Sequence, residues 1–189
     1  VNSSWRISSS CGRSPVWVRR SPWSAYGPCS NSRPFPNGSR TCWPWVAARA
    51  VLDSRVSRKV KPLLIGDAWI LHRYVQIPRL RVTPLANLSE YADNGSVNVL
   101  HVPHPEIRTL QLGRPQKVGG ESAALSIRTA VALAQTGKVM GMVTGPVSKE
   151  SLKAAGLPYP GHTEMLASLS GSGPVEMMMM AETLRTLLV

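Results

Sequence analysis

The stretch Val139-Met140-Gly141-Met142-Val143-Thr144-Gly145-Pro146-Val147-Ser148-Lys149 decides the fold class of this chain. Its apolar first half, 139–143, predicts a buried strand. The Gly-Pro pair predicts a turn at 144–146, and the residues from 147 to 155 predict a helix that Gly156 ends. In sheets of parallel strands, ligands bind at the carboxyl ends of the strands. The turn at 144–146 is therefore where we expect a ligand site.

Strands and helices alternate on both sides of this stretch. Further strands are predicted at 61–67, 97–102, 177–180 and 184–189, and helices at 68–73 and 121–135. The four methionines at 177–180 would point to both faces of a strand, so we interpret them as buried core rather than as a soft-metal site. The alternation predicts an α/β fold with a mostly parallel sheet and flanking helices.

Residues 1–50 differ from the rest in composition. They hold seven arginines, all three cysteines, five of the six tryptophans and no acidic residue. Ser, Pro, Gly and Asn interrupt this segment every few residues, which indicates loop or disorder, and we expect no helix before residue 51. An organellar transit peptide is an alternative that the tryptophans and prolines fit poorly.

The charge and hydropathy patterns exclude two classes of partner. Most of the net charge of +12 comes from residues 1–50, whose arginines are scattered among Ser and Pro. A nucleic-acid site needs basic residues clustered on one face, so we predict no nucleic-acid partner. No run of about 18 apolar residues occurs, so we predict no membrane span.

Four polar side chains follow the turn at 144–146. Lys149 could reach an anion held near the turn, although a solvated surface lysine is the more common case. His162 and Thr163 offer adjacent donors for a phosphate or hydroxyl group, whereas a lone loop histidine usually has no role. Glu164 could act as a base or could simply occupy the first turn of a helix.

Two histidines earlier in the chain form a separate candidate site. His101 and His104, three residues apart, could chelate a metal or could belong to a strand-end turn.

The order of these motifs resembles one known family. V-T-G-P-V-x-K at 143–149, A-G-L-P at 155–158, G-H-T-E at 161–164 and M-M-x-x-x-E-x-L-R at 177–185 are similar to the 4-hydroxythreonine-4-phosphate dehydrogenases, the PdxA family. The resemblance covers about residues 51–189. It implies part of a two-domain α/β fold similar to isocitrate and isopropylmalate dehydrogenases, here truncated. It also implies a cytoplasmic homodimer that uses NAD or NADP and a divalent metal (Zn, Mg or Co).

The resemblance also implies a reaction. The secondary alcohol of 4-phosphohydroxy-L-threonine would pass hydride to the nicotinamide, and the resulting β-keto acid would lose carbon dioxide, with the metal polarising the carbonyl. The family's substrate-binding His-Thr pair falls on His162 and Thr163, and Lys149 would assist by its charge. The alternatives are a related dehydrogenase acting on another phosphorylated sugar acid or a cis-diol, and an inactive truncated remnant.

Two departures from the family limit these assignments. The family's opening motif, M-G-D-P-A-G-x-G-P-E, is absent from this sequence. The family's three metal-binding histidines would all lie beyond Val189, so we assign no metal ligand in this chain. The family builds its dinucleotide site largely from its later half. We therefore assign neither a cofactor-binding nor a catalytic residue.

A sequence similar to the missing opening motif can be read from the encoding DNA in another reading frame. With suitable codons, the DNA encoding residues 37–45 reads one base later as M-D-P-A-P-A-G-P-G, which restores the family's order D-P-A-x-x-G-P. We therefore expect residues 1–50 to be largely a frameshifted translation, and 51–189 to be a partial α/β dehydrogenase domain. A genuine, unrelated extension is the alternative, and the nucleotide sequence of the locus would distinguish the two.

Overall fold

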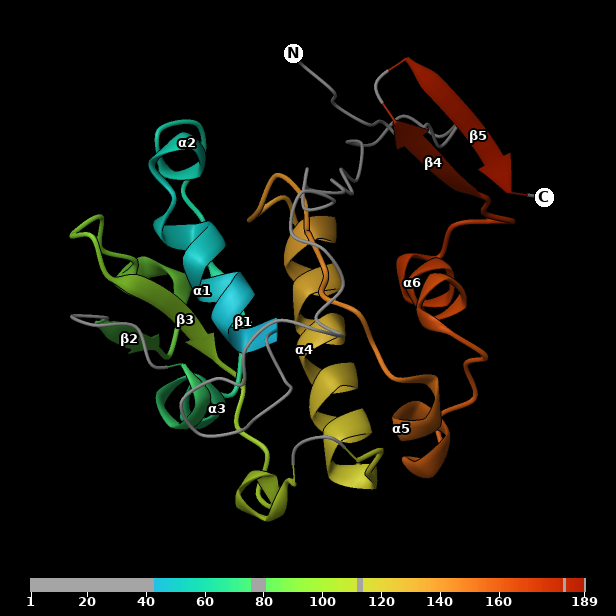
Figure 1. Cartoon of the computed structure of the whole chain (residues 1–189), viewed down its shortest axis with the longest axis horizontal. Coiled ribbons are helices and arrows are strands. Elements are labelled where there is room, and N and C mark those ends of the chain that lie inside the picture. Colours follow the sequence, from blue (N-terminus) through green and yellow to red (C-terminus); the bar gives the residue numbers. More distant parts are fainter. Residues whose placement is uncertain (1–42, 76–80, 112–113, 182, 189) are drawn as a thin grey trace, which may run out of the picture.

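The computed structural model describes residues 43–75, 81–111, 114–181 and 183–188 (Figure 1). Most of the segment that we interpret as frameshifted, residues 1–42, lies outside the described residues. The first part of the fold contains α1 (Trp43–Leu52), α2 (Ser54–Ser57), β1 (Leu64–Gly66), α3 (Ala68–Tyr74), β2 (Val82–Leu85), η2 (Leu88–Glu90), β3 (Val97–His101) and η3 (Ile107–Thr109). The second part contains α4 (Lys117–Gln135), α5 (Lys149–Ala154), α6 (His162–Ser170), β4 (Met177–Ala181) and β5 (Leu184–Leu188).

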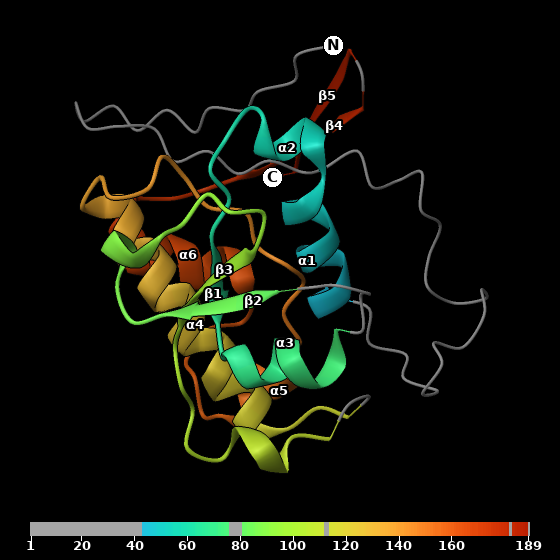
Figure 2. The same cartoon turned by 90° about the vertical axis from the view of Figure 1, so that its left-hand side faces the viewer.

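The predicted α/β class is confirmed by a three-stranded sheet of order β1-β3-β2 in which both pairs are parallel. Alternate residues of these strands point to opposite faces. Val97 and Val99 of β3 are fully buried on the face that α1 and α3 cover, together with Ala48 and Leu71. Figure 2 shows α1 and α3 along this side of the sheet.

Helix α4 covers the other face and joins the sheet to α5 and α6. Ile65 of β1 packs against a cluster that includes Ile127 and Val131 of α4 and Met165 of α6, which is fully buried. Figure 1 shows α4 between the sheet and the α5–α6 pair. None of the helices in the described ranges, α4 included, has both the length and the apolar character needed to cross a bilayer.

Asp67 links the carboxyl ends of β1 and β3. Its buried carboxylate accepts hydrogen bonds from Trp69 N at 2.9 Å, capping α3, and from His104 N at 3.1 Å. His101 Nδ1 accepts from Ala68 N at 3.2 Å. These three bonds hold the loops after the two neighbouring strands in one arrangement.

The expectation of no helix before residue 51 is wrong, because α1 begins at Trp43. Three alanines, at 47, 48 and 50, are strong helix formers, and fully buried Ala48 anchors the helix to the sheet. Helix α4 begins at Lys117, four residues before the predicted start. The adjacent Gly119 and Gly120 are poor helix formers and concealed that first turn.

The strand predicted at 139–143 is also absent. This segment has no regular secondary structure; Met140 is 87% and Val143 67% exposed, and Met142 is the one large apolar side chain of the run that is buried. A strand needs a hydrogen-bonded neighbour, and these residues pair with none of the strands in the described ranges. Thr144-Gly145-Pro146 therefore follows an irregular segment rather than a strand end.

The strands predicted near the end of the chain form an antiparallel hairpin, β4–β5, separate from the sheet. The interpretation of its methionines as buried core is wrong: Met177, Met178 and Met179 are 42%, 45% and 41% exposed. Figure 1 shows the hairpin beyond α6, away from the sheet. A two-stranded hairpin has no second layer of its own, so both of its faces stay accessible.

Gly120 permits the closest approach between α4 and α5. A Cβ atom added at Gly120 would lie 2.0 Å from the carbonyl oxygen of Ser151 and 2.5 Å from its carbonyl carbon. Both atoms belong to the backbone, so they cannot rotate away. At Gly119 the nearest atom to an added Cβ is Leu110 Cδ1 at 3.3 Å, the end of a flexible side chain.

We predict that Gly120→Ala lowers the free energy of unfolding by about 2 kcal/mol or more, because α5 must move away from α4. Gly119→Ala is the matched control, since it adds the same methyl group to the preceding helical residue. We expect it to stay within about 1 kcal/mol of the wild type, because the gain in helix propensity offsets the contact with Leu110. Urea unfolding followed by circular dichroism measures both. Equal stabilities of the two variants would contradict the proposed close approach.

Candidate functional site

The predicted site residues lie at the starts of α5 and α6. Ser148 caps α5: its hydroxyl accepts a hydrogen bond from Ser151 N at 3.1 Å and lies 3.0 Å from Glu150 Oε2. Hydrogen bonds from the backbone amide and from Ser148 lower the pKa of Glu150, which keeps its carboxylate charged. Lys149, the first residue of α5, is exposed.

His162 and Thr163 form the first turn of α6. Gly161 is the N-cap of this helix and makes no side-chain capping bond, and its carbonyl accepts from Met165 N at 3.2 Å. Met165 is fully buried in the cluster with α4, so it anchors this first turn. Because residues three apart share one side of a helix, His162 is drawn toward the same interior.

His162 has an unsatisfied polar atom. Its side chain is half-buried, and Nε2 is buried without a hydrogen-bond partner among the described residues. Burial lowers the pKa of the imidazole below its ordinary value of 6.5, so the neutral form is favoured at neutral pH. Buried polar atoms in native proteins almost always have a partner. Among the described residues, His162 Nε2 is a buried side-chain atom that departs from this rule.

The structure brings Lys149 to the start of α6. A Cβ atom added at Gly161 would lie 2.8 Å from Glu164 Oε2 and 3.4 Å from Lys149 Cε. The two side chains thus cover the α-carbon of Gly161, the residue immediately before His162. Lys149, which is 13 positions before His162 in the sequence, therefore lies against the residue that directly precedes His162 and Thr163.

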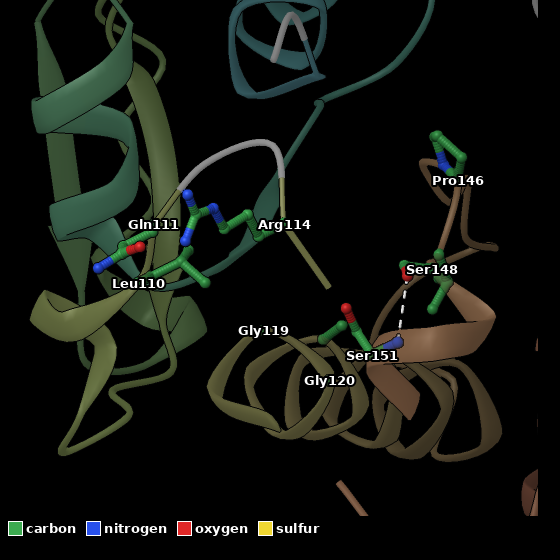
Figure 3. A pocket seen from close by; sticks show the side chains of 10 residues that line it. Leu110, Gln111, Arg114, Gly119, Gly120, Pro146, Ser148 and Ser151 are labelled. Carbon is green, nitrogen blue, oxygen red and sulfur yellow. Dashed lines mark hydrogen bonds between the residues drawn. The ribbon is translucent and has the colours of Figure 1, made fainter. Parts of the chain in front are cut away.

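The turn at 144–146 contributes to a different pocket, of about 210 Å³, between the starts of α4 and α5. Figure 3 shows Gln111 and Arg114 on one side of it, Pro146 and Ser148 on the other, and Gly119, Gly120 and Ser151 between them. Ser151 Oγ accepts from Gln116 N at 3.2 Å, which fixes the start of α4 to α5. Lys149, His162 and Thr163 do not line this pocket, so the structure divides the predicted site into two regions.

Gln111 and Arg114 line this pocket, and the sequence analysis missed them, as it missed Gln116, which holds both. Gln116 Oε1 accepts from Gln111 N at 3.2 Å, and its amide nitrogen contacts the carbonyl oxygens of Gln111 and Arg114. These bonds hold the loop that presents Arg114. The Gly119-Gly120 pair within a helical pattern was the available signal, because glycines inside a helix often mark a close packing contact.

The two histidines considered as metal chelators have partners within the protein. His101 Nδ1 accepts from Ala68 N, and His104 Nδ1 accepts from Glu106 N at 3.3 Å. The other nitrogen of His104 lies 3.3 Å from Glu121 Oε2, and Lys117 Nζ is 3.7 Å from the second oxygen of that carboxylate. These contacts join the loop after β3 to α4, and across the described ranges no three His, Cys, Asp or Glu residues are grouped to hold a metal ion.

Comparison with known proteins assigns this chain to one family. The family "Pyridoxal phosphate biosynthetic protein PdxA" matches residues 58–189. The 4-hydroxythreonine-4-phosphate dehydrogenase of Beijerinckia indica is 41% identical over 135 residues, which are 67% of this chain and 38% of that protein. The D-threonate 4-phosphate dehydrogenase of Cupriavidus necator is 34% identical over 149 residues, covering 76% of this chain and 44% of that protein.

Solved structures agree with this assignment. The crystal structure of 4-hydroxythreonine-4-phosphate dehydrogenase from Klebsiella pneumoniae superposes with a TM-score of 0.67 at 29% identity. The superposition covers 76% of this chain and 44% of that one. The chain thus spans less than half the length of the relatives that it matches.

We predict that the imidazole of His162 titrates below pH 6.5, because the charged form loses hydration on burial. The unfolded chain then binds this proton at a higher pH than the folded chain. Stability is therefore lost as the pH falls below 6.5 toward the folded-state pKa, and His162→Gln should remove this part of the loss. NMR titration of the Cε1 proton measures the value directly. A midpoint at or above 6.5 would contradict the burial of this ring.

Proposed function

The chain belongs to the PdxA family, and we propose that its protein catalyses the NAD(P)-dependent oxidation, with decarboxylation, of 4-phosphohydroxy-L-threonine in pyridoxal phosphate biosynthesis. The family match over residues 58–189 carries this proposal. The relative from Beijerinckia indica, named for the reaction on this substrate, supports it. Family members are dehydrogenases of small phosphorylated acids, and the exact substrate is the finer part of the proposal.

D-Threonate 4-phosphate is the second candidate substrate. It is favoured by the relative from Cupriavidus necator, which is named for that reaction. Both candidates carry a phosphate and a carboxylate on a short hydroxylated chain, so one site could hold either. A protein that contains this segment should bind one of the two at least tenfold more tightly than the other, and calorimetry with each compound decides between them.

We assign substrate binding to His162, Thr163 and Lys149. The unpartnered Nε2 of His162 supports this, since a ligand atom would complete its hydrogen bonding. Lys149 lies against Gly161 and brings a positive charge to the same turn. The roles follow from these positions: His162 and Thr163 orient the substrate through hydrogen bonds, and Lys149 stabilises its negative charge.

The family implies NAD or NADP as the cofactor, and we propose that the protein also uses a divalent metal ion. When bound, the nicotinamide would accept the hydride and the metal would polarise the carbonyl that forms. The described residues do not fit either group. His101 and His104 have hydrogen-bond partners within the protein, and no three His, Cys, Asp or Glu residues are grouped to hold a metal ion in the described ranges. We therefore derive no catalytic step through these groups from this chain.

The remaining expectations stand as proposals. We propose a homodimer in the cytoplasm, with no nucleic-acid partner and no membrane partner, as the family resemblance and the charge pattern imply. We likewise propose that residues 1–50 lie outside a partial dehydrogenase domain over 51–189.

We predict that His162→Ala weakens binding of the phosphorylated substrate about tenfold, the loss expected when one or two charge-assisted hydrogen bonds disappear. In a full-length enzyme that contains this segment, kcat/KM should fall between about tenfold and a thousandfold. Substrate binding should also raise the NMR titration midpoint of His162 in the wild type, a change that a purely structural histidine would not show.

His72→Ala is the control for this experiment, because His72 is exposed on α3 and outside the site. It should leave binding and kinetics unchanged. Equal affinities of the wild type and His162→Ala would remove His162 from the substrate site while leaving the family assignment intact.

We predict that the 189-residue chain by itself reduces no NAD(P), with or without added Zn²⁺, Mg²⁺ or Co²⁺. Hydride transfer needs substrate, nicotinamide and metal held together, since orientation and charge stabilisation supply most of the rate. The chain corresponds to 44% of the Klebsiella pneumoniae enzyme chain. Absorbance at 340 nm follows the reaction. Reproducible turnover that a chelator abolishes would show that the metal site lies within these residues.

A further inference from the structure

The methionine side chains of this protein differ widely in exposure. Met165 is fully buried in the cluster that α4 and α6 share, and Met142 is 9% exposed. Met140, in the irregular segment before the turn at 144–146, is 87% exposed. The three consecutive methionines at 177–179 of β4 are 42%, 45% and 41% exposed. Small solutes in water therefore reach the side chains at 177–179, whereas the packed core shields Met165.

The exposed methionines of β4 occupy both faces of the β4–β5 hairpin, because successive residues of a strand point to opposite faces. Met177 is the antiparallel partner of Leu188, and Met178 is the partner of Leu187. Side chains that lie directly opposite each other on paired strands share one face and contact each other. One methionine–leucine pair therefore stabilises each face of the hairpin.

These two pairs are important because a two-stranded hairpin is only marginally stable in water. Among the described residues the hairpin pairs with no third strand, and Figure 1 shows it apart from the three-stranded sheet. Leu187 and Leu188, the partners of the two methionines, are 47% and 43% exposed, so no second layer covers the pairs. A small loss of cross-strand contact is therefore enough to separate the strands.

A methionine thioether is oxidised by hydrogen peroxide through transfer of one oxygen atom. The O–O bond of the peroxide breaks, an S–O bond forms, and water leaves. The sulfur loses two electrons and the peroxide gains them. The product, methionine sulfoxide, is polar, and methionine sulfoxide reductases return it to the thioether while two thiols become a disulfide and water is released.

Oxidation at 177 or 178 places a polar group opposite a leucine. The S–O group accepts hydrogen bonds from water, and a leucine side chain offers it none, so the apolar contact across the hairpin is lost. Met142 and Met165 belong to the core cluster with α4 and react only when that cluster opens. Peroxide therefore acts on the hairpin before it acts on the core.

We propose that Met177, Met178 and Met179 form a reversible oxidation site, and that conversion of these residues to sulfoxides by a peroxide separates β5 from β4. The rest of the described fold keeps its packing, because its methionines in the core stay reduced. This site shares no residue with the substrate-binding assignments made above, so it is independent of which phosphorylated acid the protein takes.

The order of oxidation is measured first, on the 189-residue chain treated with dilute hydrogen peroxide. The three cysteines are alkylated beforehand so that thiol oxidation does not contribute. Tandem mass spectrometry of peptides gives the rate at each methionine. We expect the residues at 177–179 to react about tenfold or more faster than Met165, which must wait for the core to open. Equal rates would overturn the proposal, since the hairpin methionines would then be no more accessible than the core.

The separation of the strands is measured by nuclear Overhauser effects between protons of β4 and β5. Oxidation of the wild type should reduce their intensity to about half or less, because the hairpin has little stability to lose. A variant with Met177→Leu, Met178→Leu and Met179→Leu has no thioether at these positions and keeps the apolar contacts, so its hairpin should survive peroxide. Met140→Leu is the matched control: it removes an exposed thioether outside the hairpin and should give no protection.

Met178→Gln tests the same step without an oxidant, because glutamine places a polar group of similar length opposite Leu187. We expect it to weaken the cross-strand effects as oxidation does. Treating the oxidised wild type with two methionine sulfoxide reductases, one for each sulfoxide epimer, and a dithiol should restore the original spectrum. The proposal is overturned if the untreated wild type shows no cross-strand effects, if the oxidised wild type keeps them, or if the variant without the three thioethers loses them equally.

Discussion

The described structure depends on how closely α4 can approach its neighbours on both sides. One side of the helix packs against Ile65 of β1, and another packs against fully buried Met165 of α6. At Gly120 the absence of a side chain lets the backbone of α5 reach the helix surface. Without that approach α5 would shift outward. Ser148 and Lys149 would then lose their positions relative to the sheet.

The candidate site follows from this packing rather than from the predicted strand end. Met165 anchors the first turn of α6, and that anchor draws His162 partly into the interior, where its Nε2 has no hydrogen-bond partner among the described residues. Lys149 approaches the same turn from α5. The two helices thus bring an imidazole, a lysine and the Glu164 carboxylate around Gly161, and our proposal of a small phosphorylated acid as substrate rests on the imidazole and the lysine of this arrangement.

Errors in the predicted fold share one cause. The apolar run at 139–143 and the methionines at 177–180 both have the composition of buried strands. Whether such residues are buried depends on a pairing strand or a covering layer elsewhere in the protein. Among the described residues, the first run has no hydrogen-bonded strand beside it, and the second forms a hairpin whose faces are exposed.

The sequence by itself determined the α/β class and the family, because periodicity, turn residues and ordered motifs are local properties. It indicated the long helix before Gly137 and the strand at 97–101 almost to their ends. Only the tertiary structure decided that Lys149 lies against Gly161, the residue before His162, while Pro146 of the turn lines another pocket. It alone showed Gly120 as a packing contact and the methionines at 177–179 as exposed residues, because contact and exposure both arise from the packing of elements distant in sequence.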